Sequence, residues 1–281
     1  MATQKVSSEI LSEKDVVLQS VKEGNNAVSK FVFKYPPHMR KKCSDRTLKY
    51  DEDGDLILER REEGSISIEH STCTELKLVG LQIWRGALLL GDYILSQPEL
   101  FQNKVVLELG SGVGFDTIIA GMIAKEVICT DVDLGGILKL IEKNIESNKS
   151  CIKCKTCVTE LNFLDDSWNP TIMDKVKSID VIMAADVIYD DKITAGFVST
   201  LARLLNSTDA RHRVAYVALE KRYVFTIADL DAVAPMYEEF LRCIDRAALD
   251  WKIEELKLDF PQYFKYDRLK QLALLKIEKR S

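Results

Sequence analysis

The stretch VVLELGSGVGF, residues 105–115, contains three glycines at alternate positions between an apolar run and a predicted helix. Such a turn at the end of a buried strand lets the backbone approach a nucleotide-like ligand closely. The spacing Gly110-x-Gly112-x-Gly114 departs from the G-x-G-x-x-G of dinucleotide sites, and the chain has no Gly-Lys-Ser/Thr of a phosphate-binding loop. Asp116, near the start of the helix, is also unfavourable beside a pyrophosphate. The turn therefore favours a ligand without phosphate.

Two acidic residues stand at the ends of the predicted strands beside this turn. Glu108 precedes the first glycine by two residues and is suited to complement an ammonium or to bond amides around the amino-acid end of a ligand. Asp131 follows at close to the distance of about 20 residues expected for an acid that binds ribose hydroxyls. S-adenosyl-L-methionine, which carries a sulfonium and a ribose but no phosphate, satisfies these features. Its product would be S-adenosyl-L-homocysteine.

The third predicted strand ends in ELNFLDD, residues 160–166. Here Asn162 and Phe163 are expected to meet the adenine, by polar contact and by stacking respectively. Core packing explains Phe163 equally well.

The stretch IDVIMAADVIYDD places a second acidic group at the end of a buried strand. Burying a carboxylate such as that of Asp186 costs free energy, so its position at the end of a buried strand indicates a function. Ala185, the preceding residue, is predicted to border the cofactor. Methyl transfer from a sulfonium requires a nucleophile aligned within about 3–3.5 Å and the exclusion of water. A lysine amine, with a reference pKa of about 10.4, must become neutral. Asp186 is expected to guide the ammonium, and Tyr189 to pack against the alkyl arm or bond the nitrogen.

Alternating strands and helices surround these residues. Helices are predicted at 116–125, 134–148, 193–205 and 230–247, and a further one carries Ile83 to Leu95 and ends before Pro98. Strands are predicted at 104–109, 127–130, 156–161, 179–184, 214–219, 251–258 and 272–277. This order predicts a seven-stranded α/β sandwich: a parallel sheet with an antiparallel C-terminal edge hairpin. Its ligand is expected beyond the carboxyl ends of the central strands.

The chain before this pattern divides into two parts. Residues 1–45 are polar, show no strong element and are compatible with disorder. Residues 46–80 read as a small β extension, a hairpin or meander around the turn formers Asp53 and Gly54. The α/β domain is expected to span residues 81–281.

A resemblance to a known family rests on five elements of the sequence. They are ELGSGVG at 108–114, Thr130-Asp131, Asn144 with Asn148, ADVIY at 185–189 and LEKR at 219–222. Together these resemble the family 16 methyltransferases, seven-strand, S-adenosylmethionine-dependent enzymes of which many methylate protein lysines. The likeness runs from about Leu81 to the C-terminus and implies a Rossmann-like methyltransferase sandwich with a protein lysine as acceptor.

The resemblance also implies roles for individual residues. Asp186 and Tyr189 form the D-x-x-Y element that marks the methyl-acceptor site in the family. Trp84 matches a tryptophan of the helix before the domain, close to the cofactor. Glu220 and Arg222, on either side of Lys221, match a segment near the acceptor. Many members have a tryptophan where Phe163 stands.

Composition bounds the remaining possibilities. A net charge of −5 and a pI of about 5.5 argue against a protein that mainly grips nucleic acid, so nucleic acid is at most an indirect partner. The sequence shows no apolar run of about 18 residues, and neither a membrane span nor a secretory signal is expected. The basic run Arg40-Lys41-Lys42 weakly favours a location in the nucleus, alone or together with the cytoplasm. We expect the protein to be a monomer.

The motif CIKCKTC invites a metal. Its cysteines, Cys151, Cys154 and Cys157, lack a partner motif that would complete four soft zinc ligands. Free thiols and no metal are therefore expected, with a weak cluster or a redox switch as alternatives.

The leading hypothesis is protein-lysine N-methylation. One alternative is methylation of a nucleic-acid base or a small amine, although Asp186-Val-Ile-Tyr189 lacks the prolines of an N/D-P-P-Y element. Another is a binding module that keeps the methyltransferase fold without turnover. A dehydrogenase fits least because the glycine spacing differs.

Overall fold

A seven-stranded mixed sheet forms the centre of the protein. The computed structural model describes residues 5–12, 17–21, 25–40, 49–50, 53, 56–57, 63–207, 212–226 and 231–280. The sheet has the order β10-β9-β8-β11-β12-β16-β15. Its strands are β8 (Val105–Leu109), β9 (Glu126–Asp131), β10 (Lys155–Glu160), β11 (Val181–Ala185), β12 (Val214–Glu220), β15 (Trp251–Glu255) and β16 (Leu272–Lys279). The first five strands pair in parallel, and β16 runs antiparallel to both β12 and β15. This confirms the predicted sandwich and its edge hairpin.

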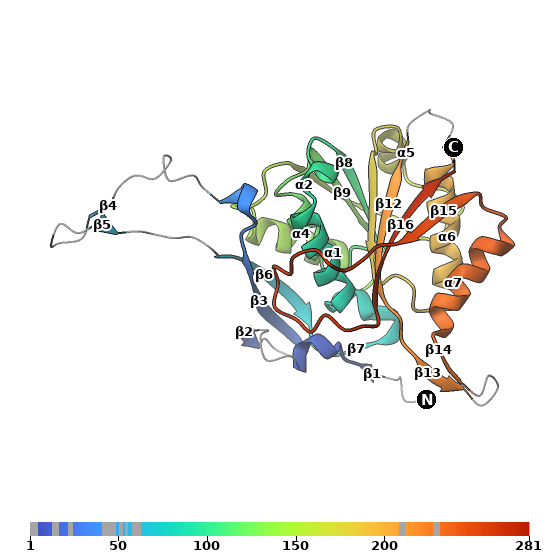
Figure 1. Ribbon diagram of the computed structural model, residues 1–281, viewed down its shortest axis with the longest axis horizontal. Helices are drawn as coiled ribbons and strands as arrows, with labels where there is room; N and C mark the ends of the chain where they lie inside the picture. The colour runs from blue at the N-terminus through green and yellow to red at the C-terminus, as the bar shows by residue number, and fades with distance from the viewer. Residues whose placement is uncertain are drawn as a thin grey trace.

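Helices cover both faces of the sheet (Figure 1), and a large hydrophobic core lies on each face. Alternate residues of a strand point to opposite faces, so Val106 and Met183 enter one core while Leu107 and Ile182 enter the other. The helices against the first core are α1 (Arg85–Ser96), α2 (Pro98–Phe101), α3 (Phe115–Ala120) and α4 (Ile137–Ser147). Those against the second are α5 (Pro170–Val176), α6 (Asp191–Leu205) and α7 (Pro235–Arg246).

A buried carboxylate on α1 holds the long connection between the last two strands. Asp92 is fully buried, and its Oδ1 accepts hydrogen bonds from the backbone N–H groups of Tyr263 (2.7 Å) and Phe264 (3.0 Å). Its Oδ2 accepts from the Tyr266 hydroxyl (3.0 Å) and the Arg268 guanidinium (2.7 Å). A buried charge with partners at both oxygens is satisfied, and here it fixes the 256–271 loop.

The N-terminal region contains a three-stranded antiparallel sheet. It consists of β2 (Val17–Val21), β3 (Asn26–Lys34) and β6 (Glu63–Ser71), in that order. In β3 every second residue is buried; two of them, Phe31 and Phe33, pack edge-on or tilted against Phe115 (5.2 Å between ring centroids) and Phe264 (5.3 Å). This differs from the expected absence of a strong element before residue 45. The paired residues of β3 and β6 are 29 to 45 positions apart in the sequence, so no local turn marks this pairing.

The first described residues also pack onto the domain. β1 (Lys5–Val6) pairs with β7 (Thr74–Glu75), and η1 (Glu9–Ser12) follows it. The buried Gln82 side chain accepts from the Ser8 N–H (2.7 Å) and donates to the Val6 carbonyl (3.0 Å). This ties residues 5–12 to the segment before α1. The expected hairpin appears as β4 (Lys49–Tyr50) with β5 (Leu56–Ile57); Gly54 of its turn lies outside the described residues.

Several element boundaries differ from expectation. α4 begins only at Ile137, because Gly135 and Gly136 both have positive φ, and Leu134 is exposed rather than on the helix. α5 was not predicted, although Asn169 caps it and Pro170 opens it. The expected helix from 230 begins at Pro235 as α7, after a hairpin of β13 (Val224–Thr226) and β14 (Asp231–Val233).

One stretch has the length and composition to cross a bilayer, although the sequence analysis expected none. It is Leu76–Ser96, which comprises η4 (Leu76–Leu81) and α1. Of its most apolar window, 72% is buried inside the fold, as is usual for a core helix of a folded domain.

Candidate active site

The glycine turn after β8 is built from left-handed backbone. Gly110, Gly112 and Gly114 have φ values of +68°, +56° and +82°, a region that residues with a Cβ rarely adopt. A Cβ at Gly112 would lie 2.9 Å from the Gly80 carbonyl oxygen, and one at Gly110 would lie 2.7 Å from Val187 Cγ1. The turn therefore needs glycine for its conformation and for its close neighbours.

Asp131, at the end of β9, is fixed against this turn. Its Oδ2 accepts from the Gly112 N–H (2.7 Å) and its Oδ1 from the Val132 N–H (2.8 Å). Burial raises the pKa of Asp131 to about 6, against the lowering effect of these two hydrogen bonds. Each carboxylate oxygen has a second lone pair, so the group can still accept from a ligand.

Two further acids lie beneath the turn. Glu108 is buried and accepts a hydrogen bond from the Thr117 hydroxyl; burial raises its pKa to about 8. Asp116, on the first turn of α3, is 1% exposed, and its Oδ1 has no hydrogen-bond partner among the residues that the structure describes. Burial, and then the nearby Glu108, raise the pKa of Asp116 well above its usual value.

Asp186 follows β11 in a strained conformation, with a φ of +53° that is unusual for a residue with a side chain. Its Oδ2 accepts from the Gly86 N–H at the start of α1 (2.6 Å), and its Oδ1 accepts from the Glu220 N–H at the end of β12 (3.1 Å). Burial raises the pKa of Asp186 to about 6. A Cβ at Gly86 would lie only 2.5 Å from Asp186 Oδ2. The carboxylate is thus held between two elements, and Gly86 leaves the room for it.

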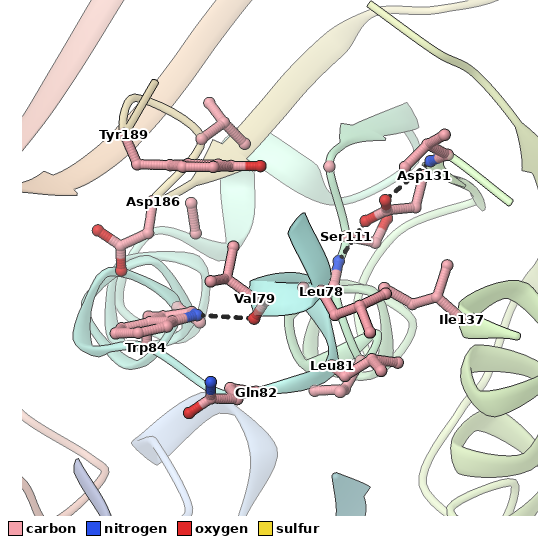
Figure 2. A pocket seen from close by; sticks show the side chains of 18 of the residues that line it. Leu78, Val79, Leu81, Gln82, Trp84, Ser111, Asp131, Ile137, Asp186 and Tyr189 are labelled. Atoms are coloured by element: carbon pink, nitrogen blue, oxygen red, sulfur yellow. Dashed lines mark hydrogen bonds between the residues drawn. The ribbon is translucent and has the colours of Figure 1, made fainter. Parts of the chain in front are cut away.

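Aromatic side chains border this carboxylate. Figure 2 shows Asp186 between Trp84 and Tyr189 at one end of the pocket, with Asp131 and Ile137 at the other. The Trp84 indole donates to the Val79 carbonyl (3.0 Å), and the Arg222 guanidinium lies 5.0 Å from its ring centroid. Tyr189 is 39% exposed, and burial of its hydroxyl raises the pKa of Tyr189 to about 12.

One pocket brings most of the predicted site residues together. Those that line it are Trp84, Glu108, Gly110, Gly112, Asp131, Asn162, Phe163, Ala185, Asp186 and Tyr189. The pocket contains about 1000 Å³ of empty space, including its opening to solvent. That is the size of a ligand cleft, and it lies at the carboxyl ends of β8, β9, β10 and β11, as the sheet order requires.

Three predicted residues are not part of the pocket lining. Gly114 caps α3 and packs toward Ile141, so it shapes the turn from behind. Glu220 forms an ion pair with Arg85 (3.4 Å) and offers its backbone N–H to Asp186. The Arg222 guanidinium lies near the Trp84 ring, and its charge lowers the pKa of Asp186. The structure thus places these three behind or beside the pocket rather than in its lining.

Asn162 and Phe163, the two residues predicted to contact adenine, both have contacts with neighbouring residues. The Asn162 amide donates to Asp165 Oδ1 (3.1 Å) and accepts from the Leu164 N–H (3.0 Å). The Phe163 ring packs on Phe197 (5.6 Å between centroids), and a Cβ on Gly110 would approach it to 3.5 Å. Phe163 therefore combines core packing with a place in the pocket.

Sequence reasoning missed part of the pocket. The segment from Lys77 to Ile83 lines it before α1, yet its residues belong to an apolar run without a motif. Asp116 also lines it, although the sequence marked Asp116 only as unsuited to a pyrophosphate. Gly86 carried no signal, since a single glycine in a helical pattern does not reveal its neighbour.

The cysteine motif lies away from this site. Cys151, Cys154 and Cys157 are half-buried free thiols, and burial raises the pKa of Cys151 and of Cys154. Within the described part of the chain, no group of three or more His, Cys, Asp or Glu residues is arranged to hold a metal ion.

Comparison with known proteins identifies relatives over most of the chain. Methyltransferase-like protein 22 is 36% identical in Mus musculus over 260 residues, and 35% identical in Homo sapiens over 268 residues. These alignments cover 82% and 85% of this chain and 64% of each relative, so the chain spans about two thirds of their length at most. The human protein-lysine N-methyltransferase EEF2KMT is 26% identical over 225 residues, covering 76% of this chain and 64% of that protein. A family model described as lysine methyltransferase matches residues 61–245, and the chain therefore belongs to the lysine methyltransferase family.

Proposed function

We propose that this protein transfers a methyl group from S-adenosyl-L-methionine to the side-chain amine of a lysine in a partner protein. The observation that carries the proposal is Asp186, a carboxylate held at both oxygens between Trp84 and Tyr189, in a chain of the lysine methyltransferase family. The leaving sulfur becomes neutral, so alignment and the exclusion of water are the enzyme's main tasks.

The charges of the pocket fit this cofactor. Glu108, Asp116, Asp131 and Asp186 all line the pocket, while Lys77 is its only basic residue among those described. Lys77 is mostly exposed and forms an ion pair with Glu75 (3.0 Å). An acidic pocket favours a ligand with cationic groups and disfavours a pyrophosphate.

The chain's own residues would bind the cofactor along the pocket. When bound, S-adenosyl-L-methionine supplies an electrophilic methyl group on a sulfonium. Asp131 has acceptor capacity left for ribose hydroxyls, and Phe163 offers a ring face near Gly110 for the adenine. Glu108 and Asp116 lie buried in the lining of the pocket and complement the cationic groups of the cofactor once they ionise. Asn162 would contribute through its backbone or after releasing Asp165.

At the other end, Asp186 and Tyr189 would receive the acceptor lysine. The Asp186 carboxylate attracts the incoming ammonium, which must lose one proton to solvent before its lone pair can attack the methyl group. It then orients the remaining N–H groups, while its two backbone hydrogen bonds keep its position fixed. Trp84 and Tyr189 provide apolar faces for the lysine's alkyl arm. Glu220 and Arg222 would act indirectly: the Glu220 N–H holds Asp186, and the Arg222 guanidinium packs near Trp84.

The surroundings of the pocket support a protein as acceptor. Among the described residues, six exposed large apolar side chains line the pocket or adjoin in sequence a residue of the site, and we name this set the mouth rim: Leu76, Val132, Leu134, Leu164, Tyr189 and Tyr223. Val132, Leu134 and Tyr189 line the pocket, and the other three adjoin in sequence Lys77, Phe163 or Arg222. Clustered exposed apolar side chains are typical of protein interaction sites.

Labelling of a nuclease-treated cell extract with methyl-labelled S-adenosylmethionine tests the proposal. We expect the wild-type protein to label one or a few protein bands, and the label to be base-stable. Asp186→Ala and Asp131→Ala should lose it, because they remove the acceptor-site and ribose-site carboxylates. Asp190→Ala is the matched control: Asp190 caps α6 in the same loop, through the Lys192 and Ile193 N–H groups.

Each outcome separates the candidate functions. Label on small molecules alone, or on nucleic acid alone in a parallel extract without nuclease treatment, would replace the lysine proposal with methylation of a base or small amine. Tight cofactor binding without transfer to any acceptor would instead favour a non-catalytic binding module.

We further propose that the protein acts as a monomer without a membrane partner, in the nucleus, the cytoplasm or both. The nuclear part rests on Arg40-Lys41-Lys42, of which Lys41 and Lys42 lie outside the described residues. Imaging of the tagged full chain, with and without substitution of these three basic residues, tests it.

A further inference from the structure

Asn144 of α4 and Asn148, which follows the last residue of that helix, hold the N-terminal sheet through nearly identical hydrogen bonds. The Asn144 side chain accepts from the Glu69 N–H (2.8 Å) and donates to the Glu69 carbonyl (3.0 Å). One helical turn later, Asn148 accepts from the Ser67 N–H (3.0 Å) and donates to the Ser67 carbonyl (2.8 Å). Both asparagines are buried, so water does not compete for these groups.

Asn144 and Asn148 differ in the acceptor of their third side-chain hydrogen bond. The Asn144 amide also donates to the Val113 carbonyl (2.9 Å), whereas the Asn148 amide donates to the Asn144 carbonyl of α4 (2.8 Å). Val113 lies between Gly112 and Gly114 in the glycine turn, and it lines the pocket. A side-chain amide nitrogen has two hydrogens, so the Asn144 nitrogen joins β6 directly to the turn.

Packing reinforces this connection. The Phe31 ring of β3 meets Phe115, the first residue of α3, edge to face at 5.2 Å between centroids. On the α4 side, Gly114 leaves room for Ile141, whose Cγ2 would lie 3.1 Å from a Cβ there. The turn contains three glycines, whose backbone has more conformational freedom than that of other residues. Its position therefore depends on the neighbours that hold it.

We propose that Asn144 is a positioning residue that couples docking of the N-terminal sheet to affinity for S-adenosylmethionine. It acts through the Val113 carbonyl, because Asn144 itself does not line the pocket. This inference rests on the proposed function, since it takes S-adenosylmethionine as the ligand of the turn. It makes β3 and β6 part of the cofactor-binding unit, although β3 precedes the segment matched by the family, residues 61–245.

Asn148 supplies the matched control, because its substitution removes the same two bonds to β6 but none to the glycine turn. The experiment compares Asn144→Ala, Asn148→Ala and the wild-type full chain by isothermal titration with S-adenosylmethionine and with S-adenosylhomocysteine. Thermal melting without ligand is measured in parallel. Both variants should melt at lower and similar temperatures. Only Asn144→Ala should bind the two ligands more weakly, by about tenfold, as the loss of one buried hydrogen bond predicts.

A second pair of variants isolates the donor. Asn144→Asp and Asn148→Asp each keep an oxygen that accepts from the β6 N–H but lose the donor hydrogens. Asn144→Asp should reproduce the weak binding, and Asn148→Asp should bind as the wild type does. Hydrogen–deuterium exchange of residues 108–116 without ligand should be faster in the Asn144 variants alone. If Asn144→Ala does not fold, the aspartate pair carries the comparison.

The results distinguish two failures. Equal affinities in matched Asn144 and Asn148 variants, with unchanged exchange at the glycine turn, would overturn this inference and leave the proposed function standing. A wild-type protein that binds neither ligand would overturn the proposed function and this inference together.

Discussion

At the scale of single residues, the pocket is a cluster of acids whose charged forms are disfavoured by burial. The pKa of Glu108 is raised to about 8, and those of Asp131 and Asp186 to about 6. In each case burial is the largest cause, and Asp116 shifts in the same direction. The folded state therefore binds these protons more tightly than the unfolded chain does. For Asp131 and Asp186, this contribution makes stability fall as pH rises from about 4 to 6.

A pH dependence of cofactor binding follows from these acids. A cationic ligand binds best to ionised carboxylates, so affinity for S-adenosylmethionine should increase from pH 5 to pH 8, with proton release on binding near pH 7. S-adenosylhomocysteine lacks the sulfonium charge and should show a smaller effect. Calorimetric titration in two buffers of different ionisation enthalpy measures the released protons. Glu108→Gln should abolish the part above pH 7; an affinity independent of pH would contradict this account.

Asp186→Asn tests the charge of the acceptor-site carboxylate with little change in shape. The amide turns one NH₂ group toward the Gly86 or Glu220 N–H, so one of the two hydrogen bonds is lost. We expect kcat to fall by about 100-fold or more and stability to fall by about 1–3 kcal/mol. Asp190→Asn is the control, since asparagine caps a helix about as well as aspartate. Transfer by Asp186→Asn at the wild-type rate would remove Asp186 from the acceptor site.

At the scale of elements, α1 contacts three parts of the molecule: the acceptor site, α3 and the 256–271 loop. Gly86 gives its N–H and its space to Asp186, Gly91 packs against Ile119 of α3, and Asp92 holds the 256–271 loop. Because these contacts come from successive turns of one helix, a shift of α1 would move the acceptor site and the loop together.

Gly86→Ala and Gly91→Ala form a pair on this helix. A Cβ at either site would lie 2.5 Å from its nearest neighbour, but that neighbour is the fixed Asp186 carboxylate in one case and the end of the Ile119 side chain in the other. Gly86→Ala should therefore reduce kcat by about 100-fold, as expected for a displaced reactive group, while Gly91→Ala mainly alters stability. Methyl-transfer kinetics and thermal melting of both variants separate the loss of kcat from the change in stability. Equal losses of kcat would show that the helix, not the carboxylate, was disturbed.

The sequence predicted the elements that have strong local signals. The apolar strands and the glycine turn each carry a pattern within a few residues. The pairing of β3 with β6 could not be predicted, because it joins segments separated by more than 25 residues. The lining from Lys77 to Ile83 escaped for a similar reason: only the folded chain brings η4 against the glycine turn, with Gly80 at Gly112.

At the scale of the whole molecule, most of the exposed large apolar side chains among the described residues line the pocket or adjoin its lining in sequence. Six of the seven exposed large apolar side chains among the described residues belong to the mouth rim; Met173 on α5 is the seventh. The chain carries a net charge of −5, and four of its acids lie in the pocket itself. A lysine presented by an apolar protein surface would match both the rim and the pocket.

Tyr223→Ala and Met173→Ala test the mouth rim as a protein-binding surface. The two side chains are almost equally exposed, 53% and 55%, but only Tyr223 follows Arg222, whose guanidinium lies near the Trp84 ring. With the labelled protein substrate, Tyr223→Ala should raise KM by about fivefold or more and leave the affinity for S-adenosylmethionine unchanged. Met173→Ala should alter neither. Identical KM values in both variants would exclude Tyr223 from substrate contact.

Asn144 and Asn148 also explain how the outer edge of β6 is closed. An exposed strand edge can pair with another chain and aggregate; here the amides of Asn144 and Asn148 take the place of a fourth strand at Glu69 and Ser67. Four helical residues rise about 6.0 Å, and two strand residues span about 6.8 Å. The difference between the helix rise and the strand rise is tolerable over two asparagine contacts, and it grows by about 0.8 Å with each further contact. A helix can therefore seal a strand edge over only a short length, and the preceding position at this spacing, Leu140, returns to the hydrophobic core.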